Sequence, residues 1–239
     1  MANYKRVLIK LSGDALGGSR GYGIDSEEIA RFGREISSSL KNGLQVGVVV
    51  GGGNMLRGAE QAELGMDRIT GDHMGMLATV INGLAIKDKL NSMGIPTIVM
   101  SSVALQGICD TFRRDHAIEA LESGKVVVFA GGTGNPLFTT DSAAALRAIE
   151  IGADALLKAT KVDGIYDKDP KKHPDAKRYN AISYQEVMEQ GLRVMDMAAI
   201  ALASENELPI RVFDFTTLDQ LRLILNGDSI GTTVGGKHA

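Results

Sequence analysis

The apolar run of residues 126–129, with the segment that follows it, constrains the fold more than any other part of the sequence. A short, continuous apolar run is typical of a strand that is buried on both faces of a sheet. After it come three glycines, where backbone can approach a ligand closely: Gly131, Gly132 and Gly134. An alanine-rich helix is then predicted from Asp141, with Thr140 as its N-cap. Strand, glycine loop and helix in this order indicate one βα unit of a parallel sheet.

The same order of elements repeats along the chain. Apolar runs predict strands at residues 6–11, 45–50, 96–100, 125–130, 154–159, 209–213 and 230–234. Helical patterns are found at residues 25–42, 71–93, 113–121, 141–152, 183–190, 195–206 and 218–226. This alternation predicts an α/β fold, a three-layer α/β/α sandwich with a mostly parallel central sheet. No long linker divides the chain, so we expect residues 1–239 to form a single domain.

Composition argues against several classes of function. The chain of 239 residues has a formal net charge of −3, which argues against nucleic acid as its main partner. No apolar run reaches the roughly 18 residues of a transmembrane helix, and the N-terminus lacks the apolar core of a signal peptide. The single cysteine, Cys109, allows no internal disulfide and fits a reducing compartment. We therefore expect a cytoplasmic protein that does not bind a membrane.

Lysines near the ends of two predicted strands point to anionic ligands. Lys10 precedes a serine-glycine turn, and Lys158 lies near the end of its strand. Because ligands collect at the carboxyl ends of strands in open α/β sheets, both lysines are placed to contact phosphates. Asp141 stands at a helix start that favours anions, so a lysine or a metal ion is expected beside it. Two anionic groups that meet at one sheet edge are what phosphoryl transfer requires.

A plainer interpretation of each feature stays open at this point. The glycines after residue 130 would also suit a simple turn before a capped helix. Lys10 would also suit an edge strand, with its ammonium group in water. Asp72 would also suit a helix N-cap. The polar segment 160–179 is either a solvated loop or, through Tyr166, a surface that stacks on a base. A second glycine loop, residues 51–54, matches neither a P-loop nor a dinucleotide-binding GxGxxG pattern.

Six motifs together resemble one known family. They are Lys10-Leu11-Ser12-Gly13, Gly51-Gly52-Gly53-Asn54, Gly71-Asp72-His73-Met74-Gly75-Met76, Thr133-Gly134-Asn135-Pro136, Thr139-Thr140-Asp141-Ser142 and Lys158-Ala159-Thr160-Lys161-Val162-Asp163-Gly164. Residues 4–231 resemble the bacterial UMP kinases, which belong to the amino-acid kinase fold family. The GDHMGM and TGNPxFTTDSAA strings are specific to these kinases. The KLSG and GGG elements are shared with acetylglutamate, aspartate and carbamate kinases.

The resemblance implies that the γ-phosphate of ATP is transferred to UMP, which gives UDP, with Lys10, Asp141 and Asp196 in the active centre. Asp72 would accept hydrogen bonds from the ribose hydroxyls of UMP. The residues implied for ATP are Lys10, Leu11, Ser12, Gly13, Gly53, Arg57, Lys158, Thr160, Tyr166 and Asp169. Those implied for UMP are Gly52, Asp72, Thr133, Gly134, Asn135, Pro136, Leu137, Phe138, Thr139 and Thr140. UMP would bind mainly within residues 1–150 and ATP mainly within residues 151–239.

The resemblance also implies a Mg²⁺ ion that ATP brings, with no protein residue as a direct ligand. It implies a homohexamer with GTP as activator and UTP as inhibitor. The loop implied for activation by GTP consists of Gly18, Ser19, Arg20, Gly21, Tyr22 and Gly23. No general base is needed, because the attacking phosphate of UMP is already anionic.

Two other classes of function remain as alternatives to a UMP kinase. A kinase of the same fold that acts on a carboxylate or on carbamate would need neither Asp72 at a ribose nor the TGNP loop. A nucleotide sensor without catalysis would tolerate the loss of Lys10. The presence of every motif lysine and of Asp141 argues against a decayed enzyme.

Overall fold

The computed structural model describes residues 4–56, 65–170, 172–192 and 195–235. Within them, nine strands form one sheet in the order β4-β3-β5-β2-β1-β6-β8-β9-β7. The strands are β1 (Arg6–Leu11), β2 (Gln45–Val50), β3 (Thr97–Ser101), β4 (Asp110–Thr111), β5 (Val126–Ala130), β6 (Ala155–Thr160), β7 (Ala181–Ile182), β8 (Ile210–Asp214) and β9 (Thr232–Val234). All pairings are parallel except that of β8 with β9. The predicted sheet is confirmed.

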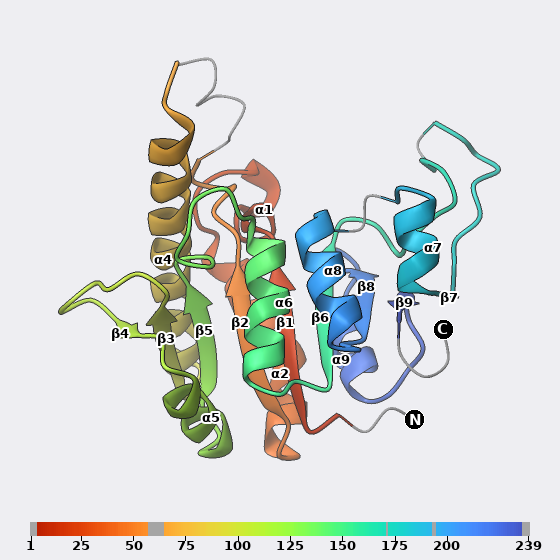
Figure 1. Cartoon of the computed structure of the whole chain (residues 1–239). Helices are drawn as coiled ribbons and strands as arrows, with labels where there is room; N and C mark the ends of the chain where they lie inside the picture. Colours follow the sequence, from red (N-terminus) through yellow and green to blue (C-terminus); the bar gives the residue numbers. More distant parts are fainter. Residues whose placement is uncertain (1–3, 57–64, 171, 193–194, 236–239) are drawn as a thin grey trace.

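Helices cover both faces of this sheet (Figure 1). They are α1 (Gly13–Leu16), α2 (Ser26–Lys41), α4 (Arg68–Ser92), α5 (Arg114–Glu122), α6 (Thr140–Glu150), α7 (Tyr184–Glu189), α8 (Met197–Glu205) and α9 (Gln220–Leu225), with a 3-10 turn η1 (Gly18–Arg20). Helices α2, α4 and α9 share one apolar core with the sheet, and α5, α6, α7 and α8 share the other. The three-layer sandwich is therefore as the sequence predicts.

Strand β1 shows how the sequence builds both cores. Val7, Ile9 and Leu11 pack into the core on the α2 face, and Leu8 packs into the core on the α6 face. Side chains of a strand point alternately to its two faces, so an apolar run fills both layers at once. Lys10 follows Leu8 with the same orientation and therefore lies under α6.

All seven predicted helix starts differ from the structure by one to three residues, and three of these differences bear on the site. Helix α4 begins at Arg68 after the N-cap Asp67, so Asp72 lies inside the helix and is not its cap. Helix α6 is capped by Thr139 and not by Thr140, and α8 begins after the N-cap Asp196. A cap is the residue whose side-chain oxygen reaches an N–H two or three residues on, and this depends on backbone dihedral angles that spacing alone does not show.

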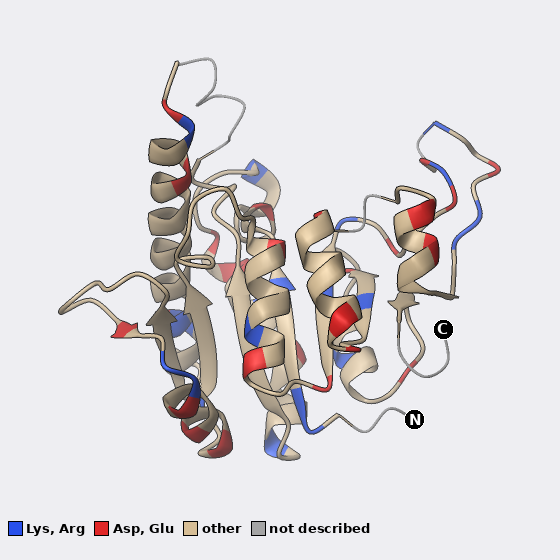
Figure 2. Ribbon diagram, in the orientation of Figure 1, with Lys and Arg blue, Asp and Glu red and all other residues tan. Residues whose placement is uncertain are grey.

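The two shortest strands, β4 and β7, escaped prediction because two residues carry no periodic pattern. The polar segment after β6 carries charges of both signs along its length (Figure 2). Tyr166 in this segment is half-buried and forms an isolated antiparallel bridge with Arg178. Among the helices of the described residues, none combines the length and the hydropathy that a membrane span requires.

Candidate active site

Two lysines stand side by side on the central strands β1 and β6. In the pairing of these strands Lys10 is the register partner of Lys158, and both side chains lie under α6. Asp141 of α6 lies between them, with Oδ1 2.8 Å from Lys10 Nζ and Oδ2 2.5 Å from Lys158 Nζ. Like charges on opposite residues repel, and the carboxylate offsets that repulsion. Lys10 is thus not an edge-strand lysine in water, since β1 lies inside the sheet and Lys10 is buried.

The pKa values of this cluster reflect burial and charge together. Burial acts to raise the pKa of Asp141, but Lys10 and Lys158 outweigh it and lower the pKa below its ordinary value of 3.8. Burial is the largest cause of the lowered pKa of Lys158, with Lys10 adding to the shift and Asp141 opposing it. Asp141 therefore stays ionised at neutral pH and holds two cationic groups within reach of one anionic ligand.

The first turn of α6 is braced by Asp196. The Thr139 hydroxyl accepts hydrogen bonds from the backbone N–H of Asp141 and Ser142, at 3.0 and 3.4 Å. Asp196 accepts in turn from the Thr139 hydroxyl and from Ser142 Oγ, the latter at 2.8 Å, and caps α8. Both carboxylate oxygens of Asp196 are thus occupied in orienting the helix that carries Asp141.

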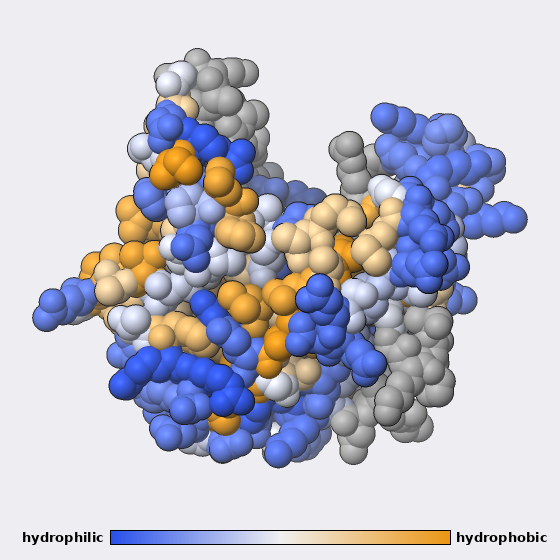
Figure 3. All heavy atoms as spheres, in the orientation of Figure 1, coloured by the Kyte–Doolittle hydropathy of each residue, from blue (hydrophilic) through white to orange (hydrophobic). Residues whose placement is uncertain are grey.

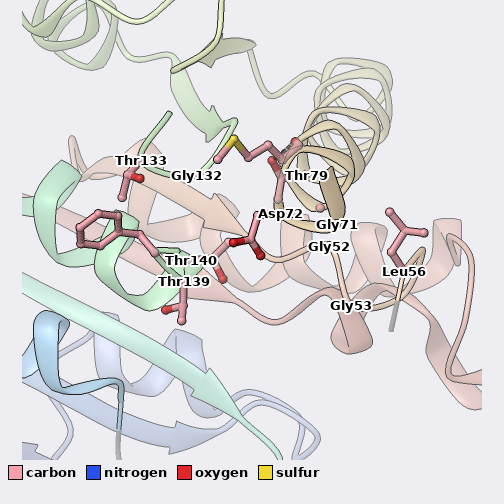
Figure 4. A pocket seen from close by; sticks show the side chains of 13 residues that line it. Gly52, Gly53, Leu56, Gly71, Asp72, Thr79, Gly132, Thr133, Thr139 and Thr140 are labelled. Carbon is pink, nitrogen blue, oxygen red and sulfur yellow. Dashed lines mark hydrogen bonds between the residues drawn. The ribbon is translucent and has the colours of Figure 1, made fainter. Parts of the chain in front are cut away.

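A cavity of about 220 Å³, called the α4 cavity below, opens beside this cluster. It is lined by Gly52, Gly53, Leu56, Gly71, Asp72, Gly75, Met76, Thr79, Gly132, Thr133, Phe138, Thr139 and Thr140. Figure 4 shows the Asp72 carboxylate near the middle of this ring of residues, on the α4 side and facing Thr139 and Thr140. The walls come from the loop after β2, from α4 and from the loop between β5 and α6.

The last of these, the glycine loop (residues 131–139), is held from two sides. Gly131 donates its N–H to the buried Thr79 hydroxyl at 2.8 Å, and Leu137 donates its N–H to Asp72 Oδ2 at 2.8 Å. Gly131, Gly132 and Gly134 have positive φ values of 76, 57 and 85°, and Leu137 has φ 72°. Such values favour glycine, so the three glycines are required by the path of the backbone.

The loop after β2 packs directly against the turn that follows Lys10. A Cβ atom at Gly13 would lie 2.5 Å from the backbone nitrogen of Gly53, which no side chain tolerates. Behind this contact the buried Asn54 and Asn82 exchange side-chain hydrogen bonds of 2.7 and 3.0 Å. Asn54 Nδ2 also donates to the Gly23 carbonyl at 2.6 Å. The Ser12–Gly13 turn, the α4 cavity and the loop before α2 are therefore tied into one unit.

A second cavity of about 260 Å³, called the α2 cavity below, lies near the Ser12 side of the cluster. Its lining residues are Ser12, Asp14, Ala15, Gly18, Glu28, Arg31, Thr160, Lys161, Phe215, Thr216 and Leu218. The Arg31 guanidinium stacks 4.3 Å above the Phe215 ring centroid and donates to the Phe215 carbonyl at 2.5 Å. An ion pair of 2.7 Å joins Arg31 to Glu28. This wall is built mainly from side chains.

The structure brings most of the predicted site residues to one edge of the sheet. The α4 cavity contains Gly52, Asp72, Thr133, Phe138, Thr139 and Thr140 from the set predicted for UMP, together with Gly53. Ser12 and Thr160 from the set predicted for ATP line the α2 cavity, and Gly18 from the loop predicted for GTP lines it as well. Leu11 is wholly buried, so it can offer a ligand only backbone groups.

Other predicted residues do not line either cavity. They include Gly134, Asn135, Pro136 and Leu137 of the glycine loop, and Tyr166 and Asp169 of the segment after β6. The Tyr166 hydroxyl donates to Asp163 at 2.8 Å, which fixes its ring near the surface segment. Arg57 lies outside the described residues.

Several residues of the site escaped sequence reasoning. Thr79 and Asn82 are fully or almost fully buried on α4, and Arg31 and Phe215 line the α2 cavity. Polar residues on the buried face of a long helix are a signal that could have identified Thr79 and Asn82, because a buried polar group needs a partner. The stacking of Arg31 on Phe215 joins α2 to β8 and has no local sequence signal.

Fold and site together define a class of protein. Two cavities flank a pair of lysines that one carboxylate holds at the carboxyl ends of parallel strands, and such a site suits two anionic substrates that react with each other. The sequence profile of the amino acid kinase family matches residues 5–214. The chain belongs to the amino acid kinase family.

Known proteins narrow the comparison within that family. A uridylate kinase of Xanthomonas campestris pv. campestris is 57% identical over 235 residues, covering 98% of each chain. A uridylate kinase of Aeromonas salmonicida is 54% identical over 231 residues, which cover 97% of this chain and 95% of that one. The crystal structure of UMP kinase from Bacillus anthracis superimposes with a TM-score of 0.94 at 39% identity, over 98% of this chain and 97% of that one.

Proposed function

We propose that this chain transfers the γ-phosphoryl group of ATP to UMP and releases UDP and ADP. It is a nucleoside monophosphate kinase, a phosphotransferase of pyrimidine nucleotide metabolism. Its relatives at 52–57% identity are named uridylate kinases. The observation that carries the proposal is the Lys10–Asp141–Lys158 cluster, which lies between the α4 cavity and the α2 cavity. UMP occupies the α4 cavity, and ATP approaches from the α2 cavity.

The chemistry follows from the charges at the site. A phosphate oxygen of UMP attacks the γ-phosphorus of ATP, the bond from that phosphorus to the β–γ bridging oxygen breaks, and ADP leaves. Charge develops on the transferring group, and the ammonium groups of Lys10 and Lys158 are placed to stabilise it. Asp141 orients both lysines and keeps their repulsion from pushing them apart. No side chain removes a proton, because the attacking phosphate is already ionised.

Asp72 is the residue proposed to recognise the ribose of UMP. Its carboxylate lies inside the α4 cavity, is 22% exposed, and accepts from the Leu137 N–H on one oxygen. The hydroxyls of a ribose are donors that a carboxylate accepts strongly. The same side chain would then read the sugar and hold the glycine loop closed over it.

The proposal includes Mg²⁺ brought by ATP. Among the described residues no group of three or more His, Cys, Asp or Glu side chains could hold a metal, and Asp141 is engaged by two lysines. This donor set fits an ion held chiefly by nucleotide phosphates and water. The ion, when bound, would neutralise charge on the phosphates of ATP, and the protein residues would act as derived above.

The division into a UMP part up to residue 150 and an ATP part beyond it stays a proposal. The α2 cavity takes Ser12, Asp14 and Arg31 from the first part and Thr160 and Phe215 from the second. ATP would therefore rest on both parts. Tyr166 and Asp169 would frame its adenine and ribose only if the segment that carries them closes on the nucleotide.

We also propose a homohexamer, activation by GTP and inhibition by UTP. Exposed apolar side chains on α4, Leu77 and Ile81 at 48 and 46% exposure, support association through this helix. Figure 3 shows apolar surface near the upper end of α4. The loop of residues 18–23 is tied through Asn54 to the α4 cavity, a connection that an activator bound there would use. The single Cys109 supports a cytoplasmic location.

A coupled assay of ADP release tests the proposal. The acceptors are UMP, CMP, dUMP, glutamate, aspartate and carbamate, each with and without Mg²⁺, and a reaction without acceptor is the blank. We expect turnover with UMP that depends on Mg²⁺, and weaker turnover with dUMP because it lacks one hydroxyl for Asp72. Turnover on glutamate, aspartate or carbamate in place of UMP would overturn the proposal, as would nucleotide binding without any turnover.

A further inference from the structure

We propose that Arg147 is a positioning residue for the α4 cavity: through the Ser102 hydroxyl its guanidinium fixes the carbonyl of Gly132, and with it the wall that meets the acceptor nucleotide. Arg147 lies on α6. Its hydrogen bonds go to Glu150 and Ser102, and neither of these residues lines the α4 cavity. The inference deepens the proposed function and rests on it for the identity of the acceptor as UMP.

Arg147 is buried at a position where an apolar side chain could fill the core equally well. It is 5% exposed, and its guanidinium carbon lies 3.7 Å from the centroid of the Phe112 ring. It forms an ion pair with Glu150 one turn along the same helix. A buried ion pair contributes little to stability compared with well-packed apolar side chains. A buried guanidinium in this place therefore needs another reason, and its remaining contact supplies one.

That contact is a hydrogen bond from Arg147 Nη2 to Ser102 Oγ, at 3.0 Å. The same hydroxyl donates to the carbonyl of Gly132 at 2.8 Å. A hydroxyl that accepts from a charged donor becomes a better donor itself, so the two hydrogen bonds strengthen each other. The chain Arg147–Ser102–Gly132 therefore transmits the position of α6 to the backbone of the glycine loop.

The glycine loop rests on the two serines at the end of β3. A Cβ atom at Gly131 would lie 2.8 Å from Ser101 Oγ, and one at Gly134 would lie 3.2 Å from Ser102 Cβ. Gly132 has positive φ and lines the α4 cavity. Gly132 has no side chain that could anchor it, so the hydrogen bond to its carbonyl is what positions its backbone.

Helix α6 is the common support of both parts of the site. Asp141 and Arg147 are six residues apart on this helix, a separation of about 9 Å along its axis. Asp141 holds Lys10 and Lys158, and Arg147 holds the start of the glycine loop. The distance between the lysines and the wall of the α4 cavity is therefore set by one rigid element, which is what positioning of two reactants requires.

The test uses Ser102→Ala, Arg147→Met and the double variant in the full-length protein. The KM for UMP is expected to rise about tenfold in each single variant, since a hydrogen bond from a charged group is lost or interrupted. The KM for ATP and kcat are expected to change less than about twofold, because the lysine cluster is untouched. The double variant should be no worse than Arg147→Met alone, since both changes break one chain.

Two further measurements separate positioning from stability. Hydrogen–deuterium exchange of peptides that cover residues 131–138 should be faster in all three variants. This expectation does not depend on whether the protein turns over UMP. Ser123→Ala is the matched control: its Oγ also donates to a backbone carbonyl, that of Ala120, at 2.8 Å, but far from either cavity. It should leave both KM values and the exchange of the glycine loop as in the natural chain. Arg147→Lys keeps the charge and should recover part of the affinity for UMP.

The outcomes are distinguishable. An unchanged KM for UMP in Ser102→Ala would overturn the inference, and so would additive effects in the double variant. Lower thermal stability with unchanged exchange in the glycine loop would assign Arg147 to the core alone. If the natural chain does not turn over UMP, the proposed function fails, and the exchange measurement then decides separately whether Arg147 and Ser102 hold Gly132.

Discussion

The α4 cavity and the α2 cavity flank the same lysine pair but are built in different ways. The α4 cavity has walls made largely of glycine backbone, and each wall is fixed from behind by a buried polar side chain such as Thr79 or Asn82. In the α2 cavity the walls are side chains, with Arg31 stacked on Phe215. A wall of braced backbone has one shape, whereas long side chains can adjust to a ligand.

The two cavities also differ in charge. Asp72 is the one ionisable residue among the described residues that line the α4 cavity. The α2 cavity is lined by both signs of charge, from Asp14, Glu28, Arg31 and Lys161. Under the proposed function, we expect the α4 cavity to discriminate among acceptors and the α2 cavity to contribute affinity for ATP.

Lys10→Ala should act on both substrates at once, because Lys10 belongs to neither cavity. We expect kcat to fall about a hundredfold or more while the dissociation constant of UMP stays nearly unchanged, since Lys10 stabilises charge that develops in the transition state. Steady-state kinetics and calorimetric titration with UMP measure the two quantities. The exposed Lys125, at the other end of the sheet, provides the control variant Lys125→Ala. An equal loss of binding and turnover would place Lys10 in the UMP site instead.

Asp141→Asn should destabilise the protein, because it removes the carboxylate that pairs with both lysines between the cavities. Removal of the carboxylate leaves two ammonium groups unpaired, and we expect the free energy of unfolding to fall by about 3 kcal/mol at neutral pH. The folded-state pKa of Asp141 lies below 3.8, so its stabilisation is present above 3.8 and is lost as the pH falls through the lower folded value. Urea unfolding over a pH series should therefore show the two proteins converging in acid. A constant difference at every pH would contradict this origin.

Asp72→Asn should affect the α4 cavity and leave the α2 cavity unchanged, and it also removes the ion pair of Asp72 with the exposed Arg68. We expect the dissociation constant of UMP to rise about tenfold, because a neutral amide accepts hydroxyl hydrogen bonds more weakly than a carboxylate. The KM for ATP should stay as it is. Asp88→Asn, at an exposed position on the same helix, controls for charge. If UMP binds the variant as tightly as the natural chain, Asp72 does not contact UMP.

Arg31→Gln is the corresponding change in the α2 cavity. It removes the stacking on Phe215 and the ion pair with Glu28, and we expect the KM for ATP to rise by about fivefold, as for the loss of roughly 1 kcal/mol. The KM for UMP should not move. A rise confined to UMP would reverse the assignment of the two cavities.

Ser183→Ala should change stability and leave both cavities alone. Ser183 and Glu186 form a capping box at the start of α7, away from both cavities. Loss of this cap should lower the free energy of unfolding by about 1 kcal/mol without any change in kcat or either KM. Thermal unfolding and steady-state kinetics check the two halves of this statement. An altered KM would show that α7 is coupled to a cavity.

Elements that depend on local pattern were predictable, and contacts across the fold were not. The apolar runs of β1, β2 and β5 and the glycines after them are visible within windows of a few residues. Thr140 was predicted as a cap and Asp72 was considered as one, but the caps are Thr139 and Asp67, because a cap is defined by one hydrogen bond and not by spacing. Tyr166 was expected at the surface but is half-buried, because it pairs with Arg178, which lies later in the same polar segment and is not its neighbour in sequence.

The α/β class of the chain, its glycine-lined strand ends and the lysines at two of them follow from the amino-acid sequence alone. They do so because periodicity, glycine and charge act locally along the chain. The three-dimensional structure was needed to show that Lys10 and Lys158 are register partners with Asp141 between them, and that Arg147 reaches Ser102, 45 residues away. Contacts of this kind depend on which strands pair and which helix covers them, and neither is encoded in the spacing of neighbouring residues.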